Sequence, residues 1–176
     1  MVSFFARSFP IPKSLYRPDA ADLRALCETE LDIVYRSILA ELTAWEQRAY
    51  RDCDEIPLLA DTLMKIKGTG MQPILEDWLA QNPSSERHEV VGWFLWSYWA
   101  ATNQLDARLV QRMISATDNL VEQVTALHAV LFALSAAAKH KSSKFYPSLS
   151  SKLVEIRNQP KKYKLEPGIL AHLESI

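Results

Sequence analysis

Apolar residues recur at steps of three and four positions along most of the chain, which is the spacing that places them on one face of an α-helix. The longest series begins at Pro18 and Asp19 and ends near Asp52. Its apolar positions are Leu23, Cys27, Leu31, Val34, Ile38, Leu42, Trp45 and Ala49. This series predicts a first helix of about nine turns with one buried face.

Proline, glycine and capping residues divide the rest of the chain into shorter helices. Pro57 is expected to open a second helix, and Gly68 and Gly70 are expected to end it by taking positive φ angles. Pro73 then starts a third helix, which stops at 82–83. Five further helices are expected: 86–102 after a cap at Ser84 or Ser85, one capped by Asp106, 120–139 capped by Asp118, one from Ser148 or Ser150 to Pro160, and 167–175.

No run of residues alternates apolar and polar side chains between hairpin turns, so no strand is expected. The pattern predicts an all-α protein of seven to eight helices, with residues 19–176 as a single domain. Residues 1–18 are expected to form an extended arm, because prolines interrupt this stretch. Short loops between the helices fit both a multi-helix bundle and a short HEAT-like helical stack. The apolar positions in 91–99 recur 33 residues later in 124–132, which favours a repeated unit and hence the stack. Two amphipathic helices often show this much similarity by chance.

The helix expected at 86–102 carries an aromatic cluster. Trp93, Trp96 and Trp99 are three positions apart, so they drift about 60° per step and do not share one narrow stripe. At least one of them is therefore expected to reach the surface. Trp is enriched at binding hot spots, and Trp96 is the candidate contact for a partner, with core packing as the alternative for the cluster.

The net charge of -1 conceals two oppositely charged parts of the chain. Residues 19–122 contain 18 acidic and 9 basic side chains. Residues 139–164 contain eight Lys or Arg residues and a single Glu. An acidic body and a basic C-terminal region are therefore expected.

Two groups of acidic residues are candidate contacts for a basic partner. Glu28 and Asp32 lie on the first predicted helix, and Asp52, Asp54 and Glu55 cluster where this helix ends. For Asp32, the favoured interpretation is an ordinary surface pair with the Arg four positions later. The loop cluster lacks the spacing of an EF-hand, so calcium is not indicated.

The alternative surface is basic. Lys161, Lys162 and Lys164 flank Tyr163, a combination that suits contact with phosphates and stacking on nucleobases. The lysines also follow the end of a predicted helix, where cations compensate the helix dipole. We therefore favour the acidic surface as the binding surface and keep nucleic-acid binding by the basic surface as the alternative.

Motifs for catalysis and for cofactor binding are incomplete. His88 and Glu89 resemble the start of a zinc-protease motif, but Gly92 occupies the position of the second His ligand. The chain also lacks the Glu-x-x-His pairs of di-iron bundles, a Gly-rich phosphate loop and a Gly-x-Ser-x-Gly elbow. We therefore expect no catalysis, no metal and no cofactor, although an enzyme with a scattered site stays a third class. His88 is interpreted as an exposed first-turn residue, and His128 as a hydrogen-bonded core residue.

Cys27 and Cys53 have no metal-binding spacing, which is typical of reduced thiols in a cytosolic protein. The first 18 residues lack the continuous apolar core of a signal peptide. No segment reaches the roughly 20 apolar residues of a membrane span. A cytoplasmic location without membrane contact is expected.

In size, helicity, lack of catalytic motifs and the acidic stretch from Asp19 to Glu122, the chain resembles the small helical immunity proteins with which bacteria block toxins of interbacterial competition systems. The resemblance carries over no binding residues. It implies a tight one-to-one complex in which an acidic face covers the cationic active site of a toxin, for example a nuclease. The alternative function is a helical-repeat adaptor or nucleic-acid-associated regulator that uses the basic C-terminal segment.

Overall fold

The structure is a computed structural model that describes residues 25–47 and 55–175. Within these residues the chain forms seven α-helices and no strand, so the predicted all-α class is confirmed. The helices are α3 (Glu28–Glu46), α4 (Glu55–Gln81), α5 (Ser85–Ala101), α6 (Ala107–Asn119), α7 (Val124–Ala138), α8 (Tyr146–Asn158) and α9 (Pro167–Glu174). The arm predicted at 1–18 lies outside the described residues.

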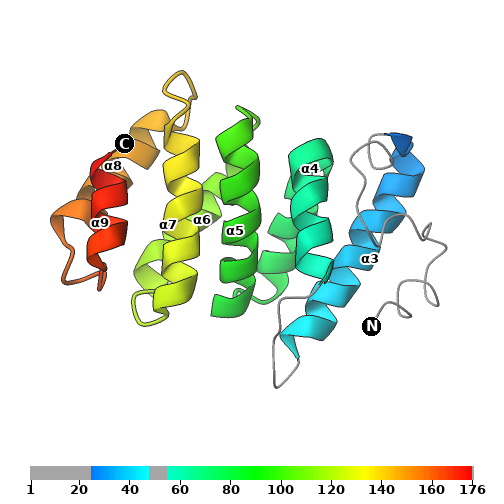
Figure 1. Ribbon diagram of the computed structural model, residues 1–176, viewed down its shortest axis with the longest axis horizontal. Coiled ribbons are helices and arrows are strands. Elements are labelled where there is room, and N and C mark those ends of the chain that lie inside the picture. The colour runs from blue at the N-terminus through cyan, green and yellow to red at the C-terminus, as the bar shows by residue number, and fades with distance from the viewer. Residues whose placement is uncertain (1–24, 48–54, 176) are drawn as a thin grey trace.

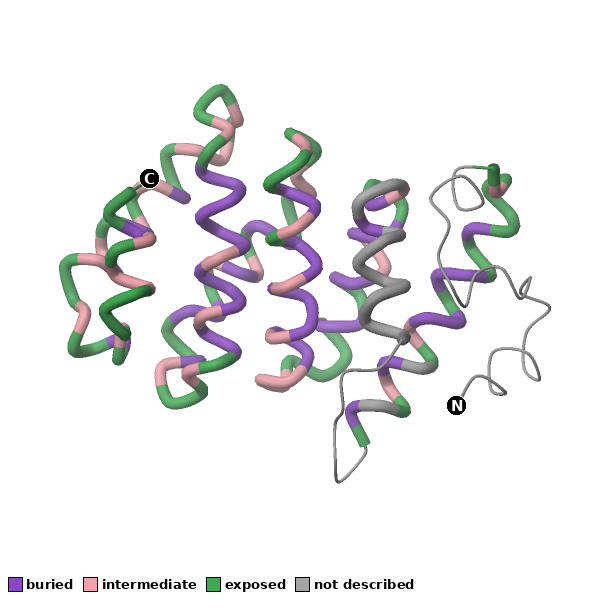
Figure 2. Tube along the Cα trace, viewed as in Figure 1, coloured by how far each residue is buried: buried purple, intermediate pink, exposed green. Residues whose placement is uncertain are grey.

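The helices lie side by side and follow the chain order along the long axis of the molecule (Figure 1). α3 lies at one end, and α8 and α9 lie at the other. α5 and α7 are neighbours in the middle and make the most extensive contact of any helix pair, with α6 behind them. The result is an elongated multi-helix bundle whose buried residues are concentrated along α5 and α7 (Figure 2).

α5 and α7 approach each other closely because Gly92 has no side chain. A Cβ atom at Gly92 would lie 2.7 Å from the carbonyl carbon of Ala129 on α7, a distance that real Cβ atoms essentially never show. Glycine therefore permits this separation of the two backbones. Leu95 of α5 and Leu127 of α7 are completely buried, as expected for helices that are apolar on most of their faces.

The apolar seam predicted for the first helix is confirmed from Leu31 to Leu42, but Cys27 is exposed and the predicted helix is interrupted at residues 26 and 27. The start predicted at Pro18 and the end predicted near Asp52 lie outside the described residues. The buried seam residues are Leu31, Val34, Ile38 and Leu42. α3 begins at Glu28, since the two residues before it are not helical. The N–H group of Cys27 donates to Glu30 Oε2 at 2.9 Å, so a side chain satisfies the backbone donor where the helix starts. Hydrophobic spacing alone does not reveal such a cap.

The predicted second and third helices form one element, α4, with a kink at Lys67 (φ -131°, ψ 27°). The helical geometry is thus interrupted next to the helix end predicted at Gly68 and Gly70, but no described glycine has a positive φ, so the predicted positive-φ cap is wrong. The two glycines instead make room for tyrosine rings. A Cβ atom would lie 2.5 Å from the ring of Tyr98 at Gly68, and 2.9 Å from the ring of Tyr35 at Gly70. The hydroxyl of Tyr35 also donates to the Lys67 carbonyl at 2.7 Å, which satisfies this oxygen at the kink.

Two of the predicted helix caps are confirmed, and one is wrong. Ser84 caps α5 by accepting a backbone N–H at 3.2 Å, and Asp106 caps α6 by accepting two backbone N–H groups. Asp118 lies in the last turn of α6, and the next helix begins at Val124 rather than at Leu120. The Asp118 carboxylate binds side chains of other elements, so it is not available as a cap.

The last two helices agree closely with the predicted pattern. α8 begins at Tyr146, slightly before the predicted start at Ser148, because Pro147 fits the first turn of a helix, where its missing N–H costs no hydrogen bond. α9 spans Pro167–Glu174, against the predicted 167–175. These two short helices close the end of the bundle opposite to α3 (Figure 1).

Candidate functional site

The acidic residues predicted on the first helix lie on its exposed side. Glu28 is the first residue of α3, and Asp32 follows one turn later. Asp32 accepts a hydrogen bond from Arg36 Nε at 2.8 Å, and the side chains of Asp32 and Arg36 are 54% and 74% exposed. This is the ordinary surface pair that the sequence predicts, and it contributes about 0.3–0.5 kcal/mol to stability.

The acidic cluster predicted after the first helix is described in part. Asp52 and Asp54 lie outside the described residues. Glu55 is the first residue of α4.

A groove of about 320 Å³ lies between α3 and α4 and contains Asp32. Among its lining residues, Leu39 and Ile74 are partly buried and Trp78 is 3% exposed. The side chains of Asp32 on α3 and Asp77 on α4 are 54% and 65% exposed. Carboxylates from both helices therefore stand above an apolar base.

A buried ion pair fixes the helices beside this groove. Arg87 Nε donates to Glu46 Oε2 at 2.7 Å, and both side chains are 7% exposed. Arg87 Nη1 donates to the carbonyl of Trp78 at 2.6 Å, and its guanidinium lies 4.5 Å from the centroid of the Trp78 ring. The hydroxyl of Ser84 donates to Glu46 Oε1 at 2.7 Å. This network joins the C-terminal end of α3 to the junction of α4 and α5, and it meets the requirement that buried charges be paired.

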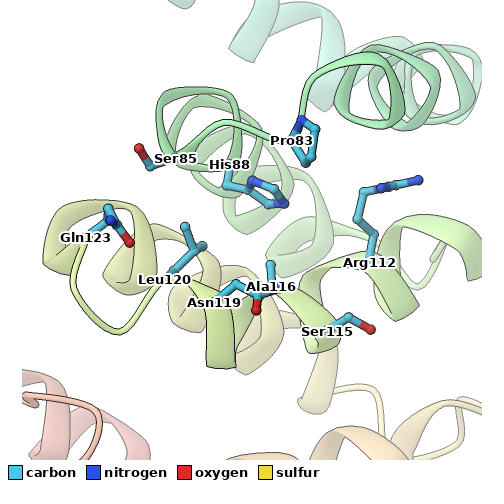
Figure 3. Close-up of a pocket in the computed structure, with 9 residues that line it drawn as sticks. All are labelled: Pro83, Ser85, His88, Arg112, Ser115, Ala116, Asn119, Leu120 and Gln123. Carbon is cyan, nitrogen blue, oxygen red and sulfur yellow. The ribbon is translucent and has the colours of Figure 1, made fainter.

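A second hollow, of about 450 Å³, lies between the first turn of α5, the helix α6 and the loop from α6 to α7 (Figure 3). Its neutral polar lining residues are Ser85, Ser115, Asn119 and Gln123, and Ala116 and Leu120 contribute apolar surface. Arg112 also lines it, but Arg112 Nε and Nη2 donate to Glu76 Oε1 at 3.1 Å and 2.5 Å. Figure 3 shows the guanidinium turned away from His88. No described Asp or Glu lines this hollow.

His88 is the most buried polar side chain in the hollow, at 5% exposed. Its Nδ1 lies 2.8 Å from the carbonyl oxygen of Ser84, and because a carbonyl can only accept, Nδ1 carries the proton. Burial lowers the pKa of His88, the Ser84 bond opposes this, and the charge of Arg112 lowers the pKa further. The ring is therefore neutral at physiological pH, and Nε2 faces the hollow as a hydrogen-bond acceptor (Figure 3).

The interpretation of His88 as an exposed residue is therefore wrong. It was based on the position of His88 in the first turn of a helix, whereas the residues of α6 cover that side of the turn. The sequence did hold a signal: His88 stands four residues after the cap at Ser84, so its side chain can reach the Ser84 carbonyl. The expectation for His128 also fails, since its Nε2 is buried without a hydrogen-bond partner among the described residues.

Trp96 is 40% exposed on α5, whereas Trp99 is completely buried, so the prediction that one Trp reaches the surface is confirmed. The centroid of the Trp96 ring lies 5.6 Å from the ring centroid of Trp93, in an edge-to-face arrangement, and 5.2 Å from that of Phe132 on α7. The ring centroids of Phe132 and of His172 on α9 lie 4.7 Å apart. The aromatic cluster is therefore on the α7 and α9 side of α5, apart from the acidic residues of α3.

Two of the three lysines of the proposed basic surface form ion pairs with acidic side chains of the same chain. Lys162 Nζ lies 3.3 Å from Asp118 Oδ1, and Lys164 pairs with Glu122. Lys161 is exposed and forms no ion pair with another described residue. Two of the three lysines thus have part of their charge compensated before any partner arrives.

Tyr163 and Asp118 form the centre of a polar network that ties α6 to α8. The Tyr163 hydroxyl lies 2.6 Å from Asp118 Oδ1 and 2.8 Å from Glu155 Oε1. Lys152 Nζ lies 2.7 Å from Asp118 Oδ2. The hydrogen bonds from Lys152 and then Tyr163 lower the pKa of Asp118 to about 2, and burial is the main cause that raises the pKa of Tyr163. The carboxylate of Asp118 is thus engaged within the fold.

Comparison with known proteins yields no relative. No family model matches the chain, and neither curated proteins nor solved structures show significant similarity to it. Across residues 25–47 and 55–175, no group of three or more His, Cys, Asp or Glu side chains is arranged to hold a metal ion. None of the described helices combines the length and the apolarity that crossing a bilayer requires.

Proposed function

We propose that this chain is a non-catalytic protein-binding module that recognises a basic protein through its α3 and α4 end. The observation that carries the proposal is the separation of charge along the molecule. α3 and α4 together contain nine acidic and three basic residues. Residues 139–164, with eight basic residues and one acidic residue, include α8 at the opposite end (Figure 1).

The molecule therefore has a negative end and a positive end. A partner with a positive surface is attracted to α3 and α4 and repelled from the far end, so charge orients it before contact. Steering of this kind acts mainly on the association rate and weakens as salt increases.

The groove between α3 and α4 offers a place for the basic partner to dock. Its apolar residues, Leu39 and Ile74, suit the stem of a Lys or Arg side chain or a neighbouring apolar residue of the partner. Asp32 and Asp77 stand on its two sides, and their carboxylates pair with Arg36 and Arg108 in the free protein. Both pairs are exposed and weak, so a cationic group of the partner can compete for these carboxylates. Trp96 lies on another face and is proposed as a separate contact.

A more specific form of the proposal is an immunity protein of the cytoplasm that neutralises a basic toxin, for example a nuclease. The sequence resemblance suggests this form, and an acidic end opposite a cationic active site fits it. The competing function, a nucleic-acid-associated regulator, would use Lys161, Lys162 and Lys164. The pairing of Lys162 with Asp118 and of Lys164 with Glu122 favours the protein-binding proposal, because it reduces the positive potential available to phosphates.

The proposal is tested by recovering partners from the native host with the intact chain and measuring their affinity for defined variants. Glu28→Lys with Asp32→Lys should weaken binding of the principal partner by about tenfold at low salt. Glu166→Lys with Glu174→Lys is the matched control, since both residues are exposed, both belong to the far end, and the change in net charge is equal.

The control variant should bind as the wild type does. Circular dichroism should show the same helix content for all proteins, because exposed substitutions usually change stability by less than about 0.5 kcal/mol. An acidic partner, or a partner whose binding is lost with Lys161→Glu but unaffected by the α3 variant, would rule out the acidic-end proposal.

A further inference from the structure

The hollow beside His88 presents an acceptor that the fold does not use. Nδ1 of His88 is held by the Ser84 carbonyl, and Nε2 forms no hydrogen bond with any described residue. A side chain that is 5% exposed has given up most of its contact with water. Nε2 itself is not sealed in the core but is reached from the hollow, so a solute that enters the hollow can donate a hydrogen bond to it in place of water.

The charges around the hollow restrict the kind of solute. A cationic ligand would meet Arg112 with no described carboxylate in the lining. An anionic ligand would meet the lone pair of a neutral imidazole, and Arg112 Nε and Nη2 are already bound to Glu76. An uncharged ligand avoids both conflicts.

The remaining lining fixes the other features of the ligand. Asn119 and Gln123 carry amides that can both donate and accept, so they suit a ligand that has an acceptor beside its donor. Ala116 and Leu120 offer apolar surface for a small nonpolar body. A volume of about 450 Å³ lies within the range of small-molecule sites.

We propose that the hollow between α5 and α6 binds a small uncharged molecule with an amide N–H, which donates to Nε2 of His88 while its carbonyl meets Asn119 or Gln123 and its apolar body contacts Leu120. This site is independent of the acidic α3 and α4 end. It adds a ligand site to a protein whose proposed function is to bind another protein.

Three related probes separate the possible chemistries. Benzamide carries the N–H donor, the carbonyl and an apolar ring without charge. N,N-dimethylbenzamide lacks the donor, and benzoate replaces the amide by an anionic carboxylate. Each probe is titrated into the full chain, and two-bond ¹H–¹⁵N spectra of the histidine side chains report where it binds. His140, whose Nε2 lies 2.6 Å from the Trp99 carbonyl, provides an internal reference.

Benzamide should shift the Nε2 resonance of His88 and leave that of His140 unchanged. Its dissociation constant should be about tenfold lower than that of N,N-dimethylbenzamide, since one hydrogen bond is worth roughly a factor of ten. Tighter binding of benzoate, equal binding of the dimethyl probe, or no shift of His88 up to the solubility limit of benzamide would each overturn the proposal.

Variants test the site from the protein side. His88→Phe keeps an aromatic ring but removes Nε2, and it should weaken benzamide binding by about tenfold. Asn119→Ala with Gln123→Ala changes exposed residues of the lining, so it keeps the test decisive if His88→Phe disturbs the fold. This double variant should also weaken binding, whereas Asn103→Ala, outside the hollow, should not. Unchanged affinity in the double variant would contradict the proposed ligand position.

Discussion

Gly92 illustrates how strongly a single residue is constrained at the centre of this bundle. An added Cβ would lie 2.7 Å from the Ala129 backbone, so Gly92→Ala must force α5 and α7 apart or distort one of them. We expect the free energy of unfolding, measured in urea, to fall by about 1–3 kcal/mol. Gly168→Ala is the matched control, because no atom lies within 4 Å of its added Cβ. Equal stability of Gly92→Ala and wild type would contradict the close approach of these helices.

Single-residue predictions from the sequence succeeded where periodicity decides burial and failed where a neighbour across space decides it. Ile38 and Leu42 are buried because the repeat of the helix places them on the core side. His88 is buried because α6 covers the first turn of α5, and no local pattern reports that contact. Gly68 follows the same rule, since it accommodates the ring of Tyr98 and does not take the positive φ that its sequence position predicts.

At the scale of helices, the buried pair of Glu46 and Arg87 links the C-terminal end of α3 to the first turn of α5. Arg87→Met removes this guanidinium from the buried Glu46 carboxylate, so the free energy of unfolding should fall by about 3–5 kcal/mol. Arg36→Met removes an exposed ion pair on α3 and should change the free energy of unfolding by less than about 0.5 kcal/mol. Urea unfolding of both variants measures the difference. Similar small losses in the two variants would mean that Arg87 is solvated rather than buried.

The contact between α6 and α8 should be sensitive to acid because the pKa of Asp118 is about 2 in the folded protein, against 3.8 as the ordinary value. A carboxyl group whose pKa is lower in the folded state stabilises the fold above pH 3.8, and this contribution is lost as the pH falls through about 2. The stability difference between wild type and Asp118→Asn should therefore be largest near neutral pH and shrink between about pH 4 and pH 2. Urea unfolding across this range checks the prediction. A difference that stays constant would show that Asp118 titrates normally.

Helix boundaries were predictable where the signal is a local cap and unpredictable where it depends on another helix. Ser84 and Asp106 cap the helices that follow them, as their sequence positions indicate. Asp118 has the same chemistry, but it lies within α6 and its carboxylate binds Tyr163 and Lys152, so it does not cap the next helix, which begins at Val124. Such competition between a cap and a tertiary contact is not visible in one sequence.

At the scale of the whole molecule, the sequence predicted the two charged parts but not their placement. The elongated order of the helices puts α3 and α8 at opposite ends, which turns a difference in composition into a difference in position (Figure 1). The groove between α3 and α4 could not be predicted, because it depends on how two helices sit against each other. Asp32 was singled out for its charge, and its place beside Leu39 and Ile74 was unknown.

The central claim, that the acidic end steers a basic partner, is tested most directly by the association rate of the recovered partner at two salt concentrations. At low salt, Glu28→Lys with Asp32→Lys should slow association by about tenfold, while Glu166→Lys with Glu174→Lys should not. At high salt the two variants should approach the wild-type rate, because screening removes long-range attraction. If both variants associate at the wild-type rate at low salt, or if the far-end variant is the slower one, the account of the acidic end is wrong.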